Sequence, residues 1–421
     1  MCTVSYGVAA RACDAIRFRI VSVMQGVVVV ADGPGAPTAD PVGAARAVGV
    51  DDGTLVLGWV VDRPPWIEAL GAWPSLTYQP ANSLVTATRE GRVRYLPVRL
   101  ASMPALLAGP LAPSVVVVPG VARGAGFAFA ESVGYSDTAA RHAPAVIVQV
   151  VEGPDCGTPA IEGNIVQVLD GGRRAAPPPD RGPSSVEQRI AQAAAALVPE
   201  GATLQYGLGR LPEAVVRAVP TPVAVISGLV TDAVADLAER DLLVGEVLAS
   251  YVWARRGADL AADGRLRLVG IEELHRGQRM ASTPRFVAVN AALEVGLDGA
   301  VNVERVGSRL VAGIGGHADY CAAASQSSGG LSMVVLSSTH GERSSIVPVP
   351  TVVSTPRSDV HVVVTEHGVA DLRGLDETER AEALVGVADP VHRSDLEGSI
   401  NARRERPLPP SHTVFPRRTS D

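Results

Sequence analysis

The chain has no lysine, so all 37 of its basic residues are arginines. Schiff-base catalysis and phosphate binding by a P-loop both depend on the lysine amine, and its absence excludes both. The formal net charge is −7, and no run of basic residues interleaved with aromatics occurs. We therefore expect no nucleic acid partner.

Cysteine is scarce as well. The four cysteines are scattered without a CxxC spacing, at Cys2, Cys13, Cys156 and Cys321. This pattern favours reduced thiols in a cytoplasmic protein over a disulfide framework or a zinc site. The histidine pair at positions 361 and 367 has no third ligand at a suitable spacing, so we expect no metal site.

Long apolar runs are missing too, and none reaches the length of a membrane span. Residues 20–31 follow several arginines and have the outline of a signal peptide. The run is interrupted by Ser22 and Gln25, and it ends in a glycine turn at 32–36. These features favour a buried strand over a signal peptide, and Met24 is a second possible translation start.

Aromatic residues make up only 4% of the chain, so its cores must consist of valine, alanine and leucine. Short valine-rich runs, apolar on both faces, alternate with helical patterns. Such alternation is typical of a parallel sheet buried on both sides. The first part predicts strands at 26–31, 54–61, 114–118 and 145–151, and helices at 41–48 and 135–142.

A proline- and glycine-rich stretch at 170–183 cannot hold a helix or a central strand. Directly after it, Ser184 and Glu187 form a capping box that opens a helix over 185–197. The alternation then resumes, with strands at 203–207 and 223–226 and helices at 211–218 and 232–240. A chain of 421 residues is too long for one core. We therefore predict two open α/β domains with mostly parallel sheets, over residues 1–175 and 184–402, and a loose tail at 403–421.

Two glycine-rich loops are candidate binding sites. Each follows or precedes a predicted strand, where glycines let a phosphate approach the N–H groups of a helix N-terminus. A tight strand-to-helix turn is the alternative interpretation of the first loop. The candidate binding residues are Gly207, Leu208, Gly209, Arg210, Leu211, Gly313, Gly315 and Gly316.

Another candidate site lies at the end of the strand predicted over 223–226, where a loop carries Ser227 and Gly228. No Gly-x-Ser-x-Gly motif occurs, and no His–Asp set stands near Ser227. Hydrogen bonding within the loop is therefore the interpretation for Ser227, with Thr231 as the N-cap of the next helix.

Five stretches in a fixed order resemble the acetyl-CoA hydrolase/transferase family, which includes acetate, butyrate, succinate and 4-hydroxybutyrate CoA-transferases. They are residues 91–104, 201–212, 286–302, 311–320 and 355–374. The resemblance implies the open α/β fold of CoA-transferases in two domains, with coenzyme A held between loops. It also implies acyl-CoA and a carboxylic acid as substrates, no permanently bound cofactor, and a homodimer.

In this family a glutamate carboxylate attacks the acyl-CoA thioester, and a glutamyl-CoA thioester follows a mixed anhydride. The resemblance places Gly228 at the position of this glutamate and Ile226 at that of the usual histidine. Glycine cannot form the covalent intermediate. A further departure is His317, which stands where glutamine is common.

We predict an acyl-CoA hydrolase or CoA-transferase that acts on the thioester of a small carboxylic acid. Water can occupy the space of the missing side chain, with Asp232 or Glu366 as general base. The alternatives are charge placement at a helix N-terminus for Asp232 and a strand-end hydrogen bond for Glu366. A protein that binds acyl-CoA without turnover is the alternative function.

Overall fold

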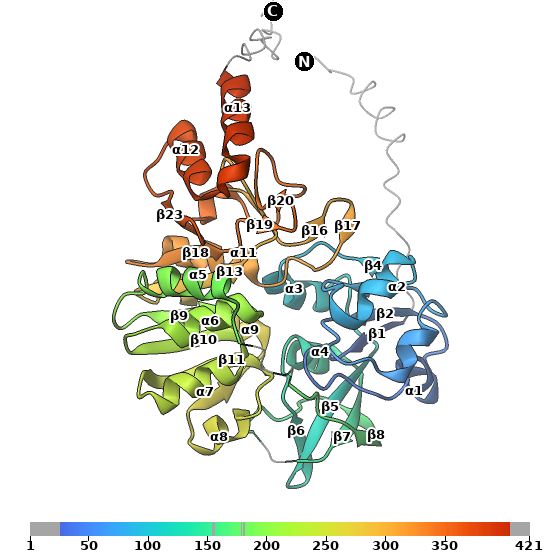
Figure 1. Ribbon diagram of the computed structural model, residues 1–421. Coiled ribbons are helices and arrows are strands. Elements are labelled where there is room, and N and C mark those ends of the chain that lie inside the picture. Colours follow the sequence, from blue (N-terminus) through green and yellow to red (C-terminus); the bar gives the residue numbers. More distant parts are fainter. Residues whose placement is uncertain (1–25, 154–155, 178, 180–181, 405–421) are drawn as a thin grey trace, which may run out of the picture.

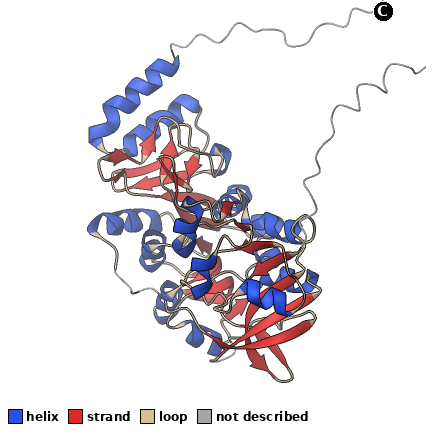
Figure 2. Ribbon diagram, turned by 90° about the vertical axis from the view of Figure 1, so that its right-hand side faces the viewer, coloured by secondary structure: helices blue, strands red, loops and turns tan. Residues whose placement is uncertain are grey.

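The computed structural model describes residues 26–404, except for 154–155, 178 and 180–181 (Figure 1). Two eight-stranded sheets form the centres of the two halves of the chain, and helices cover their faces (Figure 2). Most strand pairs in both sheets are parallel, which confirms the predicted fold class. Residues 27–30 form a buried strand, as expected for the run at 20–31. Residues 20–25 of that run with Met24, the cysteines Cys2 and Cys13, and the tail from residue 405 lie outside the described residues.

The first sheet has the strand order β4-β3-β2-β1-β5-β7-β8, and β6 pairs with β5. Its strands are β1 (Val27–Val30), β2 (Thr54–Leu57), β3 (Ser75–Thr77), β4 (Arg94–Tyr95), β5 (Val115–Arg123), β6 (Gly126–Phe129), β7 (Ala145–Val151) and β8 (Ile165–Gly172). The helical segments are α1 (Pro41–Ala47), η1 (Pro65–Ala69), η2 (Asn82–Leu84), α2 (Val85–Arg89), η3 (Leu100–Ser102), α3 (Met103–Leu107) and α4 (Ser136–His142). All residues of β1 are buried because helices cover both faces of the sheet.

The second sheet has the order β12-β11-β10-β9-β13-β18-β22-β23. Its strands are β9 (Thr203–Tyr206), β10 (Val223–Val230), β11 (Leu243–Val252), β12 (Leu266–Leu268), β13 (Phe286–Ala291), β18 (Leu331–Val335), β22 (Val362–Thr365) and the antiparallel β23 (Gly368–Asp371). Its helices include α5 (Ser185–Ala195), α6 (Arg210–Ala218), α7 (Asp232–Glu239), α8 (Gly257–Ala262), α9 (Ile271–Leu274), α10 (Gly277–Ser282) and α11 (His317–Gln326). The predicted capping box of α5 is present.

Smaller elements complete the second half. They are β14 (Glu294–Gly296), β15 (Val301–Asn302) and β21 (Ile346–Val347) in one sheet, the pairs β16 (Arg305–Val306) with β17 (Arg309–Leu310) and β19 (Thr339–His340) with β20 (Arg343–Ser344), and η4 (Arg357–Asp359), α12 (Glu377–Val387), η5 (Pro390–His392) and α13 (Arg393–Arg404). Helices α12 and α13 lie at the end of the molecule far from the first sheet (Figure 1).

The predicted loop around Gly228 is wrong, because β10 continues to Val230 instead of ending at residue 226. Ser227 and Leu229 stay in register with Ala249 and Tyr251 of β11. Continued pairing with this neighbour therefore extends the strand beyond its valine-rich part.

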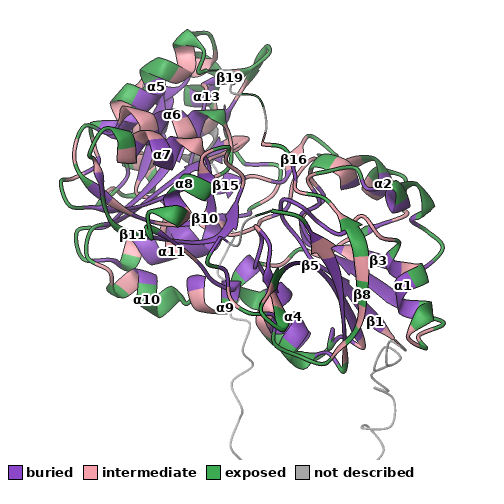
Figure 3. Ribbon diagram, turned by 90° about the horizontal axis from the view of Figure 1, so that it is seen from below, coloured by how far each residue is buried: buried purple, intermediate pink, exposed green. Residues whose placement is uncertain are grey.

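Direct contacts join the two halves. The backbone N–H of Val133 donates to Ser250 O at 2.9 Å, and that of Leu100 donates to Gly315 O at the same distance. One cluster of buried apolar side chains includes residues of both sheets, and buried strands face the region between the halves (Figure 3). The division into domains at 1–175 and 184–402 stays a prediction, although the sheets lie on either side of the proline-rich stretch.

Candidate active site

A cavity of about 300 Å³ lies where the two halves meet. It is lined by six of the residues singled out in the sequence, namely Gly207, Leu208, Gly228, Gly313, Gly315 and Gly316. Segments from separate parts of the chain thus converge on one site.

The fold accounts for this convergence. Strands β9, β10 and β13 run parallel, so their carboxyl ends meet at one edge of the sheet, where ligands of open α/β proteins bind. Gly207 follows β9 directly, and a Cβ there would lie 2.9 Å from Asn290 Oδ1. Asn290 and Gln205 exchange two side-chain hydrogen bonds, of 2.9 and 3.2 Å, in the wall of the cavity.

The loop before α11 forms the opposite wall, and its glycines are required by close backbone contact. A Cβ at Gly313 would lie 2.0 Å from the carbonyl oxygen of Tyr78, in the first half of the chain. A Cβ at Gly316 would lie 2.6 Å from the ring of His275. Only glycine therefore lets this loop approach both neighbours.

Gly228 faces the cavity from within β10, and its backbone is extended. A Cβ at this position would lie 3.1 Å from Tyr320 Oη, its nearest neighbour. Among the described residues that line the cavity, none is a carboxylate. The position that the family resemblance assigns to a nucleophile thus opens onto a site without one.

A row of hydrogen-bonded, buried polar side chains ends beside Gly228. The hydroxyl of Tyr320 lies 3.1 Å from His275 Nε2, and His275 Nδ1 lies 3.2 Å from Asp319 Oδ2. Asp319 Oδ2 also accepts a hydrogen bond of 3.0 Å from the backbone N–H of Ala101. Asp319 and Tyr320 lie within the glycine-rich stretch that the sequence marked, but neither was a candidate there.

His317, the first residue of α11, also lines the cavity. Its Nδ1 lies 2.8 Å from Thr355 Oγ1, whereas its Nε2 is buried without a hydrogen-bond partner. Burial lowers the pKa of this imidazole to about 4, so it is neutral at pH 7. A neutral ring with one free nitrogen can hydrogen-bond a ligand.

A second buried carboxyl group stands behind the cavity wall. Tyr78 and Tyr251 line the cavity, and both donate a hydrogen bond to Asp32 Oδ2, at 2.6 and 2.7 Å. The other carboxyl oxygen of Asp32 is buried without a partner. Burial raises the pKa of Asp32 to about 6, against the opposing effect of the tyrosine hydrogen bonds. The sequence placed Asp32 in a glycine turn. Its position directly after a buried strand was the one feature that could have marked it as a residue of the site.

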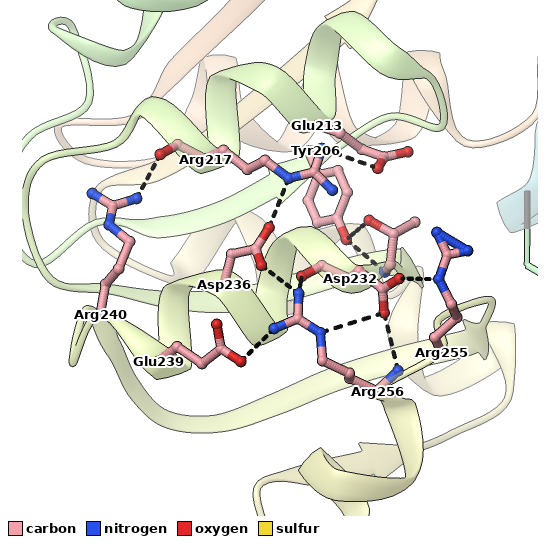
Figure 4. A network of polar contacts seen from close by, with 10 residues as sticks. Tyr206, Glu213, Arg217, Asp232, Asp236, Glu239, Arg240, Arg255 and Arg256 are labelled. Carbon is pink, nitrogen blue, oxygen red and sulfur yellow. Dashed lines mark hydrogen bonds and ion pairs between the residues drawn. The ribbon is translucent and has the colours of Figure 1, made fainter. Parts of the chain in front are cut away.

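Asp232 faces a different cavity. It begins α7, and its carboxylate accepts a hydrogen bond of 3.0 Å from the backbone N–H of Arg256 and lies 3.6 Å from Arg255 Nε (Figure 4). It lines an adjoining cavity of about 500 Å³ together with Gly209 and Arg210. Leu208 lines both cavities.

Glu366 and Leu211 are not among the residues that line the cavity at Gly228. The carboxylate of Glu366 accepts hydrogen bonds from the backbone N–H and the hydroxyl of Ser338, both at 2.8 Å. These bonds are the strand-end contacts expected of a structural role. The catalytic roles of Asp232 and Glu366 stay predictions.

The comparisons with known proteins agree with this architecture. The family model described as the acetyl-CoA hydrolase/transferase C-terminal domain matches residues 260–400. A 4-hydroxybutyrate coenzyme A transferase of Clostridium kluyveri is 28% identical over 54% of this chain and 56% of its own length. Residues 260–400 thus match the C-terminal domain of the acetyl-CoA hydrolase/transferase family, in agreement with the resemblance of the sequence.

Other relatives of this chain are enzymes by name. The Fasciola hepatica succinyl-CoA:acetate/propanoyl-CoA:succinate CoA transferase is 28% identical over 79% of this chain and 75% of its own length. A butyryl-CoA:acetate CoA-transferase of Anaerostipes caccae is 28% identical over 51% of this chain and 53% of its own length. The chain thus spans about half the length of two of these three relatives.

Solved structures share the fold. RipA from Yersinia pestis has a TM-score of 0.77 at 21% identity, over 90% of this chain and 94% of its own. The 4-hydroxybutyrate CoA-transferase of Porphyromonas gingivalis has a TM-score of 0.68 at 23% identity, over 93% and 96%. In the described part of this chain, no helix has the length and apolar character of a membrane span, and no cluster of potential metal ligands occurs.

We predict that Gly313→Ala destabilises the protein by about 1–3 kcal/mol, the usual range for overpacking. The added Cβ would meet the backbone of Tyr78, which cannot rotate away. Chemical denaturation measures the change in the free energy of unfolding. Gly386→Ala, in α12 with open space around its Cβ, is the matched control and should be neutral or stabilising. Equal effects of both substitutions would contradict the close contact.

We predict that the stability of the Asp32→Asn variant relative to the wild type increases as the pH rises from 4 to 6. The pKa of Asp32 is raised from 3.8 to about 6 in the folded state. The stability contributed by the protonated carboxyl group is therefore complete below pH 3.8 and is lost as the pH rises through about 6, a total change of about 3 kcal/mol. Denaturation at several pH values measures the difference, with the exposed Asp51→Asn as control. A difference that is constant with pH would refute the prediction.

Proposed function

We propose that this chain is an acyl-CoA hydrolase or CoA-transferase that acts on the thioester of a small carboxylic acid. One observation carries the proposal. Stretches that resemble the family, far apart in sequence, converge on the cavity at Gly228. The relatives named above act on such thioesters, and the cavity is the place where this chain would hold one.

The dimensions of the site agree with an acyl group and its thioester. About 300 Å³ is at the small end of ligand pockets, so the cavity is too small for all of coenzyme A. We propose that the rest of the ligand extends past Leu208 into the adjoining cavity, which Gly209 and Arg210 line. Polar groups of Tyr320 and His317 are available to the thioester in the cavity at Gly228.

The remaining features follow from the resemblance and from cysteine usage. We propose a cytoplasmic homodimer that binds coenzyme A only as part of its substrate. Light scattering of the purified protein, with and without acetyl-CoA, measures its mass in solution and tests the homodimer.

Release of free thiol from acetyl-CoA, with and without acetate or succinate as acceptor, tests the activity. Hydrolysis predicts release that needs no acceptor, and transfer predicts formation of a new acyl-CoA that does need one. Binding of CoA without turnover across a panel of acyl-CoA thioesters would reject the enzyme and leave a binding protein.

We predict that Gly228→Glu creates acceptor-dependent transfer of CoA. The backbone at this position is extended, so a side chain is tolerated once the hydroxyl of Tyr320, 3.1 Å from the new Cβ, moves by a few tenths of an ångström. Mass spectrometry of the glutamyl-CoA adduct and of the new acyl-CoA measures the change. Gly228→Gln has the same shape without a nucleophile, and equal behaviour of the two variants would refute the alignment.

A further inference from the structure

We propose that Tyr320, together with His275 and Asp319, replaces the missing glutamate as the catalytic machinery and makes the chain a hydrolase of acyl-CoA. This inference rests on the proposed acyl-CoA site. Its basis is a hydrogen-bonded chain of three side chains that ends beside Gly228.

The direction of each hydrogen bond follows from the chemistry of the groups. A carboxylate only accepts hydrogen bonds, so His275 must place its proton on Nδ1, 3.2 Å from Asp319 Oδ2. His275 Nε2 is then an acceptor, and the hydroxyl of Tyr320 donates to it over 3.1 Å. A hydroxyl, an imidazole and a carboxylate thus stand in the order of a Ser-His-Asp triad, with tyrosine in the place of serine.

The surroundings fix this arrangement. The side chains of His275 and Asp319 are 1% and 5% exposed, and Tyr320 is buried as well. Asp319 lies in the first turn of α11, where the helix dipole and the N–H of Ala101 stabilise its negative charge. Hydrogen bonds in such a site are strong and already oriented before substrate arrives.

The hydroxyl of Tyr320 lies beside the position where the reaction would take place. Tyr320 Oη lies 3.1 Å from the place of a Cβ at Gly228, where the family resemblance puts the nucleophile. The absent side chain leaves room for a water molecule between this hydroxyl and a thioester in the cavity. Burial and the charge of Asp319 raise the pKa of Tyr320 well above its ordinary value, so the phenol stays protonated and suits proton transfer better than attack.

The reaction is balanced without another reactant. Water attacks the thioester carbonyl carbon and gives one proton to Tyr320 Oη, while the phenolic proton passes to His275 Nε2. The tetrahedral intermediate then breaks its carbon–sulfur bond. The thiolate of coenzyme A receives the proton from His275 through Tyr320. The products are the free acid and coenzyme A, and the three side chains return to their starting state.

Tyr320→Phe tests the role of the hydroxyl in the full-length protein. We expect kcat for thiol release from acetyl-CoA to fall about 10²–10⁴-fold, the usual contribution of general acid–base catalysis, with KM and the Kd for CoA unchanged. A fall of less than threefold would overturn the inference, as would an acyl adduct on Tyr320 detected by mass spectrometry. An inactive wild type would instead reject the proposed function, and the hydrolytic role with it.

Asp319→Asn is the second variant, and it tests the orientation of His275. The amide removes the charge that holds the proton on His275 Nδ1, so kcat should fall while KM stays constant. An unchanged kcat would overturn the proposed role of Asp319.

Gly228→Glu combined with Tyr320→Phe separates a structural role of Tyr320 from a chemical one. This double variant should transfer CoA to acetate although it lacks the hydroxyl. Transfer that also requires Tyr320 would show a role other than water activation and overturn the inference.

Discussion

The contact between the loop at 311–316 and the first half of the chain is the constraint on which the site depends. Gly313 lies so close to the carbonyl of Tyr78 that no side chain fits between them. This loop leads directly into α11, so its position also determines where Tyr320 reaches the cavity and where Asp319 lies behind it. A backbone contact between two halves of the chain thus positions the side chains of the site.

Buried polar groups surround the cavity, and their hydrogen bonds offset the free energy of removing them from water. Gln205 and Asn290 satisfy each other, and Asp32 accepts from two tyrosines of the cavity wall. Two polar atoms near the cavity have no partner in the described structure, Asp32 Oδ1 and His317 Nε2. Such groups destabilise a protein and are typical of functional sites.

Local sequence patterns predicted the parts of the fold that depend on a single segment. Valine runs identified buried strands such as β7, and Ser184 with Glu187 identified the start of α5. The glycines that line the cavity were also visible, because close backbone contact requires glycine. The predicted end of β10 was wrong, because pairing with β11 determines where the strand ends and its own residues do not.

Side-chain partners distant in sequence escaped prediction. His275 lies 44 residues before Asp319, and Tyr251 lies 219 residues after Asp32. No periodicity connects such positions, because only the packing of distant helices and strands brings them together. Asp232 was visible as a carboxylate at a helix start, but the contact with Arg256 that occupies it depends on the third dimension.

The place of Gly228 within a paired strand also matters for engineering. Its neighbours Ser227 and Leu229 remain in register with β11, so the backbone cannot rearrange freely when the side chain changes. A residue introduced there would project into the cavity from a rigid support, as designed catalytic sites require. The position is therefore a ready attachment point for nucleophiles of different chemistry, such as cysteine or aspartate, on an otherwise unchanged scaffold.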